Sequence, residues 1–154
     1  MALKSLSPMP LKGANENDPV APGKHPSQPP RRILVVDDDS QIRQVCSSVL
    51  IHHGHQVDVA ADGEAGWRAL HTASLSQESY DLLITDHQMP KLSGLELVHK
   101  LRAAHLALPV IMVSGIPPIN TESLQIAAVL PKPFSPEALM KTVTEVLLFS
   151  RGPR

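Results

Sequence analysis

The chain has little cysteine, few aromatic residues and no surplus of either charge. Its single cysteine, Cys46, excludes an internal disulfide and a cysteine-rich zinc site, which fits a reducing compartment. Fourteen lysines and arginines stand against fifteen aspartates and glutamates, so no general basic field is available for nucleic acid or anionic lipid. No apolar run approaches the ~18 residues that cross a bilayer, and the N-terminus lacks the apolar segment of a signal peptide. We therefore expect a cytoplasmic protein that contacts neither nucleic acid nor membrane directly.

Proline is abundant, but it is concentrated at the N-terminus. Residues 1–30 hold seven of the fifteen prolines and show no sustained apolar period. Such a segment cannot bury enough surface to offset the entropy lost on ordering, so we predict a disordered tail there. Residues 31–150 have the composition of one globular domain, and residues 151–154 form a short C-terminal tail.

Within residues 31–150, apolar runs alternate with apolar residues at helical spacing. The runs predict strands at Ile33–Val36, Gln56–Ala60, Leu82–Thr85, Val110–Val113 and Ala128–Leu130. The helical spacing predicts helices over about 42–50, 63–73, around 97–101, a short one at 121–127, and one beginning at Ser135-Pro136. Five strands interleaved with helices predict an α/β fold with a doubly wound parallel sheet covered on both faces.

Polar residues follow four of these strands. Asp37 and Asp38 come directly after the first strand, Asp86 after the third, Ser114 after the fourth and Lys132 after the fifth. In a doubly wound sheet of order 2-1-3-4-5, the ligand crevice lies at the carboxyl ends of the strands, beside the switch point between strands one and three. We therefore expect these side chains from separate parts of the chain to converge there.

Crowded carboxylates repel each other, and a hard divalent cation with oxygen ligands, Mg²⁺ above all, relieves the repulsion. With a metal and an ammonium neutralising a phosphoryl group, a carboxylate can attack it in line and form an aspartyl phosphate. In this hypothesis Asp86 is the nucleophile, while Asp37 and Asp38 hold Mg²⁺. Ser114 donates to a phosphoryl oxygen, and Lys132 supplies positive charge.

The segments ILVVDDDS, LLITDHQMPKLSG, VIMVSG and LPKPF resemble, in order, the four conserved segments of the response-regulator receiver domain, a CheY-like family of two-component signalling. The resemblance implies phosphotransfer to Asp86 from a histidine kinase or a histidine phosphotransfer protein. It implies Mg²⁺ held by Asp38, Asp86 and the backbone carbonyl of Gln88, with Asp37 contributing, and a cis Lys132-Pro133 bond. A receiver is a signalling domain that catalyses only its own phosphorylation and dephosphorylation.

The chain departs from the family at its usual output face. Receivers commonly carry an aromatic residue three positions before the lysine, where this chain has Val129. The stretch IPPIN places two prolines where the fourth helix of a receiver begins, which predicts that this helix is shortened. Because only five residues follow Phe149, we expect a stand-alone receiver whose signal passes through contact with a downstream protein of unknown identity.

Two other functions are compatible with parts of the pattern. A phosphatase of the haloacid dehalogenase type also forms an aspartyl phosphate, but after the lysine only Glu137 and Glu145 remain to complete its metal site. A receiver-like binding module that no longer accepts phosphate normally lacks an acid, the hydroxyl or the lysine, and none is missing here. Asp39 is better explained as a cap of the first helix than as a catalytic acid.

Overall fold

A computed structural model describes residues 29–150, so most of the predicted tail 1–30 and all of residues 151–154 lie outside the described residues. Five parallel strands form one sheet in the order β2-β1-β3-β4-β5, as predicted. The strands are β1 (Arg32–Val36), β2 (Gln56–Ala60), β3 (Leu82–Asp86), β4 (Val110–Ser114) and β5 (Ala128–Pro131). Each expected strand is present, and none is more than one residue longer than its apolar run.

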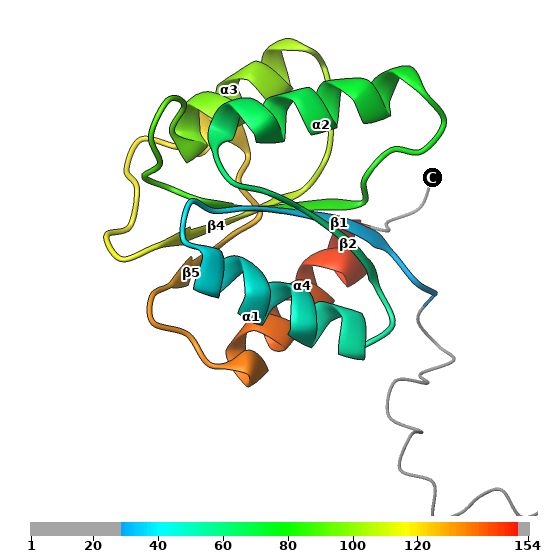
Figure 1. The fold of residues 1–154 in the computed structure, drawn as a ribbon. Helices are drawn as coiled ribbons and strands as arrows, with labels where there is room; N and C mark the ends of the chain where they lie inside the picture. The colour runs from blue at the N-terminus through cyan, green and yellow to red at the C-terminus, as the bar shows by residue number, and fades with distance from the viewer. Residues whose placement is uncertain (1–28, 151–154) are drawn as a thin grey trace, which may run out of the picture.

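Four α-helices cover the two faces of the sheet, which forms the middle layer in Figure 1. They are α1 (Ser40–His52), α2 (Gly63–Leu75), α3 (Gly94–Ala103) and α4 (Pro136–Ser150). Helices α1 and α4 lie on one face, and α2 and α3 on the other (Figure 1). No helix within residues 29–150 has both the length and the hydropathy that a membrane span requires.

Alternation along the strands divides the core into two halves. In β1, Ile33 and Val35 pack toward α1 and α4, whereas Leu34 and Val36 pack toward α2 and α3. Cys46 belongs to the first half and is fully buried, as expected from its place on the apolar side of α1. Each fully buried aliphatic side chain contributes about 1.5–3 kcal/mol to stability. The sheet is therefore a rigid platform for the side chains at its ends.

Polar side chains begin the helices where the sequence leads one to expect it. The carboxylate of Asp39 accepts backbone N–H bonds from the first turn of α1, and Asp62 does the same for α2. Ser93 and Glu96 form a capping box at the start of α3. Ser135 accepts a bond of 3.0 Å from the N–H of Ala138 in α4. Asp39 is thus a helix cap, in agreement with the sequence analysis.

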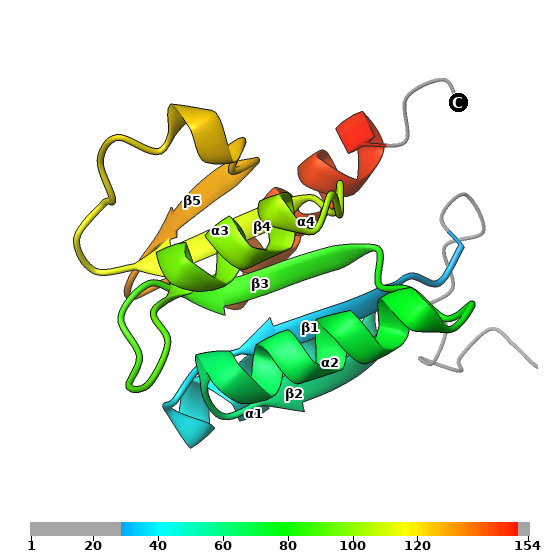
Figure 2. The ribbon, with the colours of Figure 1, turned by 90° about the horizontal axis from the view of Figure 1, so that it is seen from above.

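The fourth helix of the family is reduced here to a single 3-10 turn, η3 (Glu122–Leu124). The short helix predicted at 121–127 is therefore wrong in length, because only residues 122–124 are helical. Asn120 and Gln125 adopt left-handed backbone conformations, with φ of 57° and 56°, so the turn is bounded on both sides. Figure 2 shows α3 above β3 and β4, whereas η3 and an irregular loop lie beside β5.

Candidate functional site

Three aspartates meet at the carboxyl ends of β1 and β3, which are neighbours in the sheet. Asp37 follows β1 directly, and Asp86 is the last residue of β3. One carboxylate oxygen from each of Asp37, Asp38 and Asp86 lies within 4.8 Å of the others. Asp37 and Asp86 are only 2% and 7% exposed, whereas Asp38 is open to solvent. The sequence prediction that these acids converge is therefore correct.

The carboxylate of Asp37 is fixed by its neighbours. Its Oδ1 accepts a 2.8 Å bond from the backbone N–H of Asp39, and its backbone carbonyl accepts 2.7 Å from Arg43. Burial raises the pKa of Asp37, the backbone bond from Asp39 lowers it, and the charge of Asp86 raises it further. The net direction of the pKa is upward, chiefly because burial disfavours the charged form of the carboxyl group.

Lys132 bridges the two buried acids from the end of β5. Its Nζ lies 3.1 Å from Oδ1 of Asp86 and 3.6 Å from Oδ2 of Asp37. Burial by itself lowers the pKa of Lys132, but the hydrogen bond to Asp86 and the charge of Asp37 outweigh it, so the pKa is raised overall. The ammonium is therefore charged at neutral pH. The Lys132-Pro133 bond is cis, as the resemblance implied.

Ser114 ends β4 next to Asp86, and its hydroxyl lies in a small network. The hydroxyl donates to the carbonyl of Ile116 and accepts 3.1 Å from the N–H of Ile116. Nδ1 of His87 lies 3.3 Å from the same oxygen. The sequence analysis did not single out His87, because a histidine directly after the acid carries no signal of a contact with a residue 27 positions later.

The donor set at this edge of the sheet suits a hard divalent cation. Three carboxylates face one ammonium, so the site keeps excess negative charge, and all its candidate ligands are oxygen atoms. Asp38 is the exposed member, which leaves one side of the group open to solvent. Gln88, predicted to offer its backbone carbonyl, lies exposed two residues after Asp86, and that role stays a prediction.

The connection between β3 and α3 is packed tightly against the site. A Cβ added to Gly94 overlaps the carbonyl oxygen of Asp86, and a Cβ added to Gly63 overlaps the backbone of Leu92. The N–H of Gly94 also donates 2.8 Å to the carbonyl of His87. Close backbone approach at these two glycines therefore fixes the segment that begins with Asp86.

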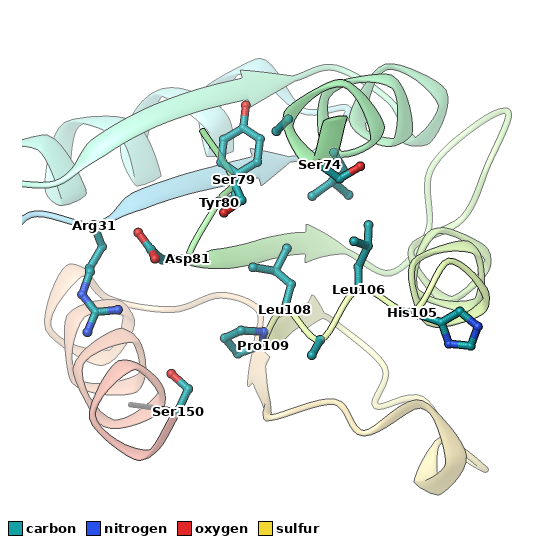
Figure 3. A pocket seen from close by; sticks show the side chains of 13 residues that line it. Arg31, Ser74, Ser79, Tyr80, Asp81, His105, Leu106, Leu108, Pro109 and Ser150 are labelled. Atoms are coloured by element: carbon teal, nitrogen blue, oxygen red, sulfur yellow. The ribbon is translucent and has the colours of Figure 1, made fainter. Parts of the chain in front are cut away.

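A cavity of about 400 Å³ lies at the opposite end of the sheet. Its lining includes residues that precede the strands, such as Arg31, Asp81 and Pro109, and Figure 3 shows Arg31 and His105 on opposite sides. The carboxylate of Asp81 is occupied by a 2.8 Å bond from the N–H of Arg32. The lining of this cavity includes none of the predicted site residues.

The histidines near the end of α1 have structural contacts. Nδ1 of His53 lies 2.9 Å from the carbonyl of Val49, and Nδ1 of His55 accepts 3.2 Å from the N–H of Arg31. Within residues 29–150, the histidines do not join a group with the spacing of metal ligands. Val129, which stands where the family usually has an aromatic residue, is 41% exposed on β5.

The strand order, the acid cluster and the lysine bridge are those of one family. The model of the response regulator receiver domain matches residues 33–144. The chain belongs to the response regulator receiver family. It is 33% identical over 123 residues to a chemotaxis protein CheY homolog of Campylobacter jejuni, covering 75% of this chain and 92% of the homolog.

Receiver domains are also parts of larger proteins. The chain is 31% identical to 3',5'-cyclic-nucleotide phosphodiesterase regA of Dictyostelium discoideum, but it spans only 15% of that protein. Among solved structures, the response regulator protein TrrA of Thermotoga maritima, in complex with Mg²⁺-BeF, is 28% identical with a TM-score of 0.67. That match covers 75% of this chain and 98% of TrrA. Receiver domains bind Mg²⁺ through an acidic cluster, and this receiver has a cluster of three aspartates.

Proposed function

We propose that this receiver accepts a phosphoryl group on Asp86 in a Mg²⁺-dependent reaction. The donor is a phosphohistidine on a histidine kinase or a histidine phosphotransfer protein, and the signal passes on through contact with a further protein. The observation that carries the proposal is the meeting of the Lys132 ammonium, 3.1 Å from Asp86, with three carboxylates whose oxygens lie within 4.8 Å of one another. Receivers take part in two-component signalling, which supports this class of donor.

In the transfer, a carboxylate oxygen of Asp86 attacks the phosphorus atom. The new P–O bond forms as the P–N bond to the donor imidazole breaks, and the imidazole leaves with the electron pair and takes up a proton. Lys132 stabilises the negative charge on the phosphoryl oxygens, since its raised pKa keeps it charged. The hydroxyl of Ser114, at the end of the adjacent strand, donates to a phosphoryl oxygen.

The residues present fit a bound Mg²⁺. Asp37, Asp38, Asp86 and the backbone carbonyl of Gln88 are the proposed ligands, all of them oxygen donors. When bound, the metal would supply positive charge that neutralises the phosphoryl oxygens.

Intact-protein mass spectrometry after incubation with acetyl phosphate and Mg²⁺ tests the proposal. The native chain is expected to gain one phosphoryl group that is lost on mild base treatment, as an acyl phosphate would be. Asp86→Asn is the matched control, because it keeps the shape of the side chain and removes the nucleophile. An adduct that persists in Asp86→Asn, or no adduct from either acetyl phosphate or a phosphorylated histidine phosphotransfer protein, contradicts the assignment.

A receiver that binds a partner in one fixed conformation is the second candidate. Val129 and the 3-10 turn at Glu122–Leu124 favour it, because both alter the face through which receivers commonly signal. Beryllofluoride, a phosphoryl analogue, separates the two functions when added with Mg²⁺. Binding that depends on Asp86 supports the phosphoacceptor, and no binding to the folded chain supports the fixed module. A haloacid dehalogenase-type phosphatase is disfavoured, since the two acids that follow Lys132, Glu137 and Glu145, lie within α4 and outside the group of clustered carboxylates.

A further inference from the structure

The hydroxyl of Ser114 is fully engaged in this structure. A serine hydroxyl can donate one hydrogen bond and accept two. Ser114 donates its proton to the carbonyl of Ile116 and accepts 3.1 Å from the N–H of the same residue. Nδ1 of His87 lies 3.3 Å from the same oxygen, and in the tautomer that carries a proton on Nδ1 it donates to the remaining lone pair. Ser114 cannot turn toward a phosphoryl group without giving up bonds that it makes here.

The backbone of His87 is held on both sides. Its N–H donates to the carbonyl of Val113 at 3.0 Å and to Oδ1 of Asp86 at 2.9 Å. Its carbonyl accepts 2.8 Å from the N–H of Gly94, which lies so close to the backbone of Asp86 that an added Cβ would overlap the Asp86 carbonyl. With the backbone fixed, the half-buried imidazole ring is the part of His87 that can respond when its partner moves.

We propose that His87 is a positioning residue that holds Ser114 in its resting orientation and is released when Ser114 engages the phosphoryl group. The inference rests on the proposed phosphorylation of Asp86. In this receiver the released imidazole takes the role of the aromatic residue that receivers commonly carry where this chain has Val129. The ring stands next to the loop that carries Ile116, which is 68% exposed, so its release changes the surface beside the site.

The aromatic residues of the described chain are all committed elsewhere. Trp67, which belongs to α2, lies near the ammonium of Lys100, and the hydroxyl of Tyr80 donates a 2.6 Å hydrogen bond to Asp58. Phe134 packs against the half of the core that faces α1 and α4, and Phe149 is exposed at the end of α4. The imidazole ring of His87, in contrast, lies in contact with the hydroxyl of Ser114.

The first test measures the affinity of the full chain for beryllofluoride in the presence of Mg²⁺. His87→Leu removes the bond that holds Ser114, so it is expected to bind beryllofluoride about two- to tenfold more tightly than the native chain, the value of one neutral hydrogen bond. His87→Asn is the conservative variant, because its side-chain nitrogen can lie near the place of Nδ1, and it is expected to restore the native affinity.

A double-mutant cycle separates positioning from a general effect on the site. In a Ser114→Ala background, His87→Leu is expected to leave the affinity for beryllofluoride unchanged, because the hydroxyl that it releases is absent. An equal gain with and without the hydroxyl, or no gain in the native background, overturns the inference.

The second test needs no variant of His87 and so does not depend on its folding. In the native chain, the ring ¹⁵N resonances of His87 are expected to shift when Mg²⁺ and beryllofluoride saturate the site, and Ser114→Ala is expected to remove most of that shift. Binding with an unmoved His87 ring overturns this inference and leaves the phosphoacceptor function intact. Failure of the native chain to bind beryllofluoride overturns the proposed function, and this inference with it.

Discussion

Two glycines beside the acidic site differ in the space around them. We therefore expect substitution by alanine to have different effects on stability at the two positions. A Cβ on Gly94 overlaps the carbonyl of Asp86, whereas a Cβ on Gly115 meets nothing within 4 Å. Gly94→Ala must push the backbone of Asp86 away, and we expect it to cost about 1–3 kcal/mol, the usual range for overpacking. It should also slow phosphorylation by acetyl phosphate, because it displaces the acceptor.

Gly115→Ala is the matched control for that substitution. We expect its free energy of unfolding, measured by urea denaturation, to stay within about 0.5 kcal/mol of the native value. Equal stability of the two alanine variants would show that the β3–α3 connection relaxes freely, contrary to the tight packing described above.

Buried His55 makes stability depend on pH. Burial lowers the pKa of His55 below its ordinary value of 6.5, and the neighbouring charges of His53 and Arg31 lower it further, while Asp81 opposes them. Below pH 6.5 the unfolded chain then binds more protons than the folded one, so stability falls as the pH drops from 6.5 toward the lowered pKa. Above pH 6.5 this contribution is fully present.

Asn at position 55 keeps an acceptor for the N–H of Arg31 but does not titrate. Urea denaturation of His55→Asn at several pH values is therefore expected to show a shallower loss of stability than the native chain between pH 6.5 and the pH at which other groups titrate. Parallel pH profiles for the two proteins would assign the loss to other groups.

At the scale of elements, the sequence was sufficient where local chemistry decides the outcome. Apolar runs bounded by polar residues located every strand, and a cap residue such as Asp62 or Ser135 marked where a helix begins. The segment after β4 could be predicted only in part from its local sequence. Its prolines predicted a shortened helix, but the reduction to η3 depends on the left-handed conformations of Asn120 and Gln125 and on contacts with α3. Such contacts are not visible in a local pattern.

Arg102 on α3 supplies the contacts that hold this irregular segment. Its guanidinium donates to backbone carbonyls at distances between 2.8 and 3.2 Å, those of Leu106, Leu108, Leu124 and Gln125. Arg102→Met keeps much of the aliphatic stem and leaves these acceptors without a donor. We expect a loss of about 1–3 kcal/mol in stability and faster amide hydrogen exchange in residues 120–127.

Arg68 on α2 provides the control for Arg102, because it is exposed on the same face of the sheet. Arg68→Met is expected to leave both stability and hydrogen exchange near their native values. If Arg102→Met accelerates exchange evenly over the whole domain, the arginine supports the fold at large and has no special role at η3.

At the scale of the whole molecule, the acid cluster, Ser114 and Lys132 could be brought together from the sequence because topology alone places strand ends at one edge. Topology predicts the neighbours of residues at strand ends only. The contact between His87 and Ser114 depends on the direction of one side chain in a connecting segment. The two bonds from Arg102 to Leu124 and Gln125 depend on how an irregular loop returns to α3. Periodicity carries no information on either.

Mg²⁺ is expected to stabilise the whole domain, since the acids proposed to hold it lie close together only in the folded chain. At a concentration one hundred times the dissociation constant, one bound ion adds about 2.7 kcal/mol to the free energy of unfolding, which raises Tm by roughly 5–10 °C for a domain of this size. Asp38→Ala should abolish most of this rise while changing the metal-free stability little, because Asp38 is exposed.

Asp39→Ala is expected to affect the metal-free stability and the Mg²⁺-dependent rise in Tm in the opposite way to Asp38→Ala. Loss of the cap of α1 should cost about 1 kcal/mol without metal, yet leave the Mg²⁺-dependent rise in Tm intact. Thermal melts of the native chain and both variants, with Mg²⁺ and with a chelator, separate the two roles of adjacent acids. If Asp39→Ala removes the Mg²⁺ effect and Asp38→Ala does not, then the ligand set is wrong, and the metal is held by the acid that this structure assigns to the helix.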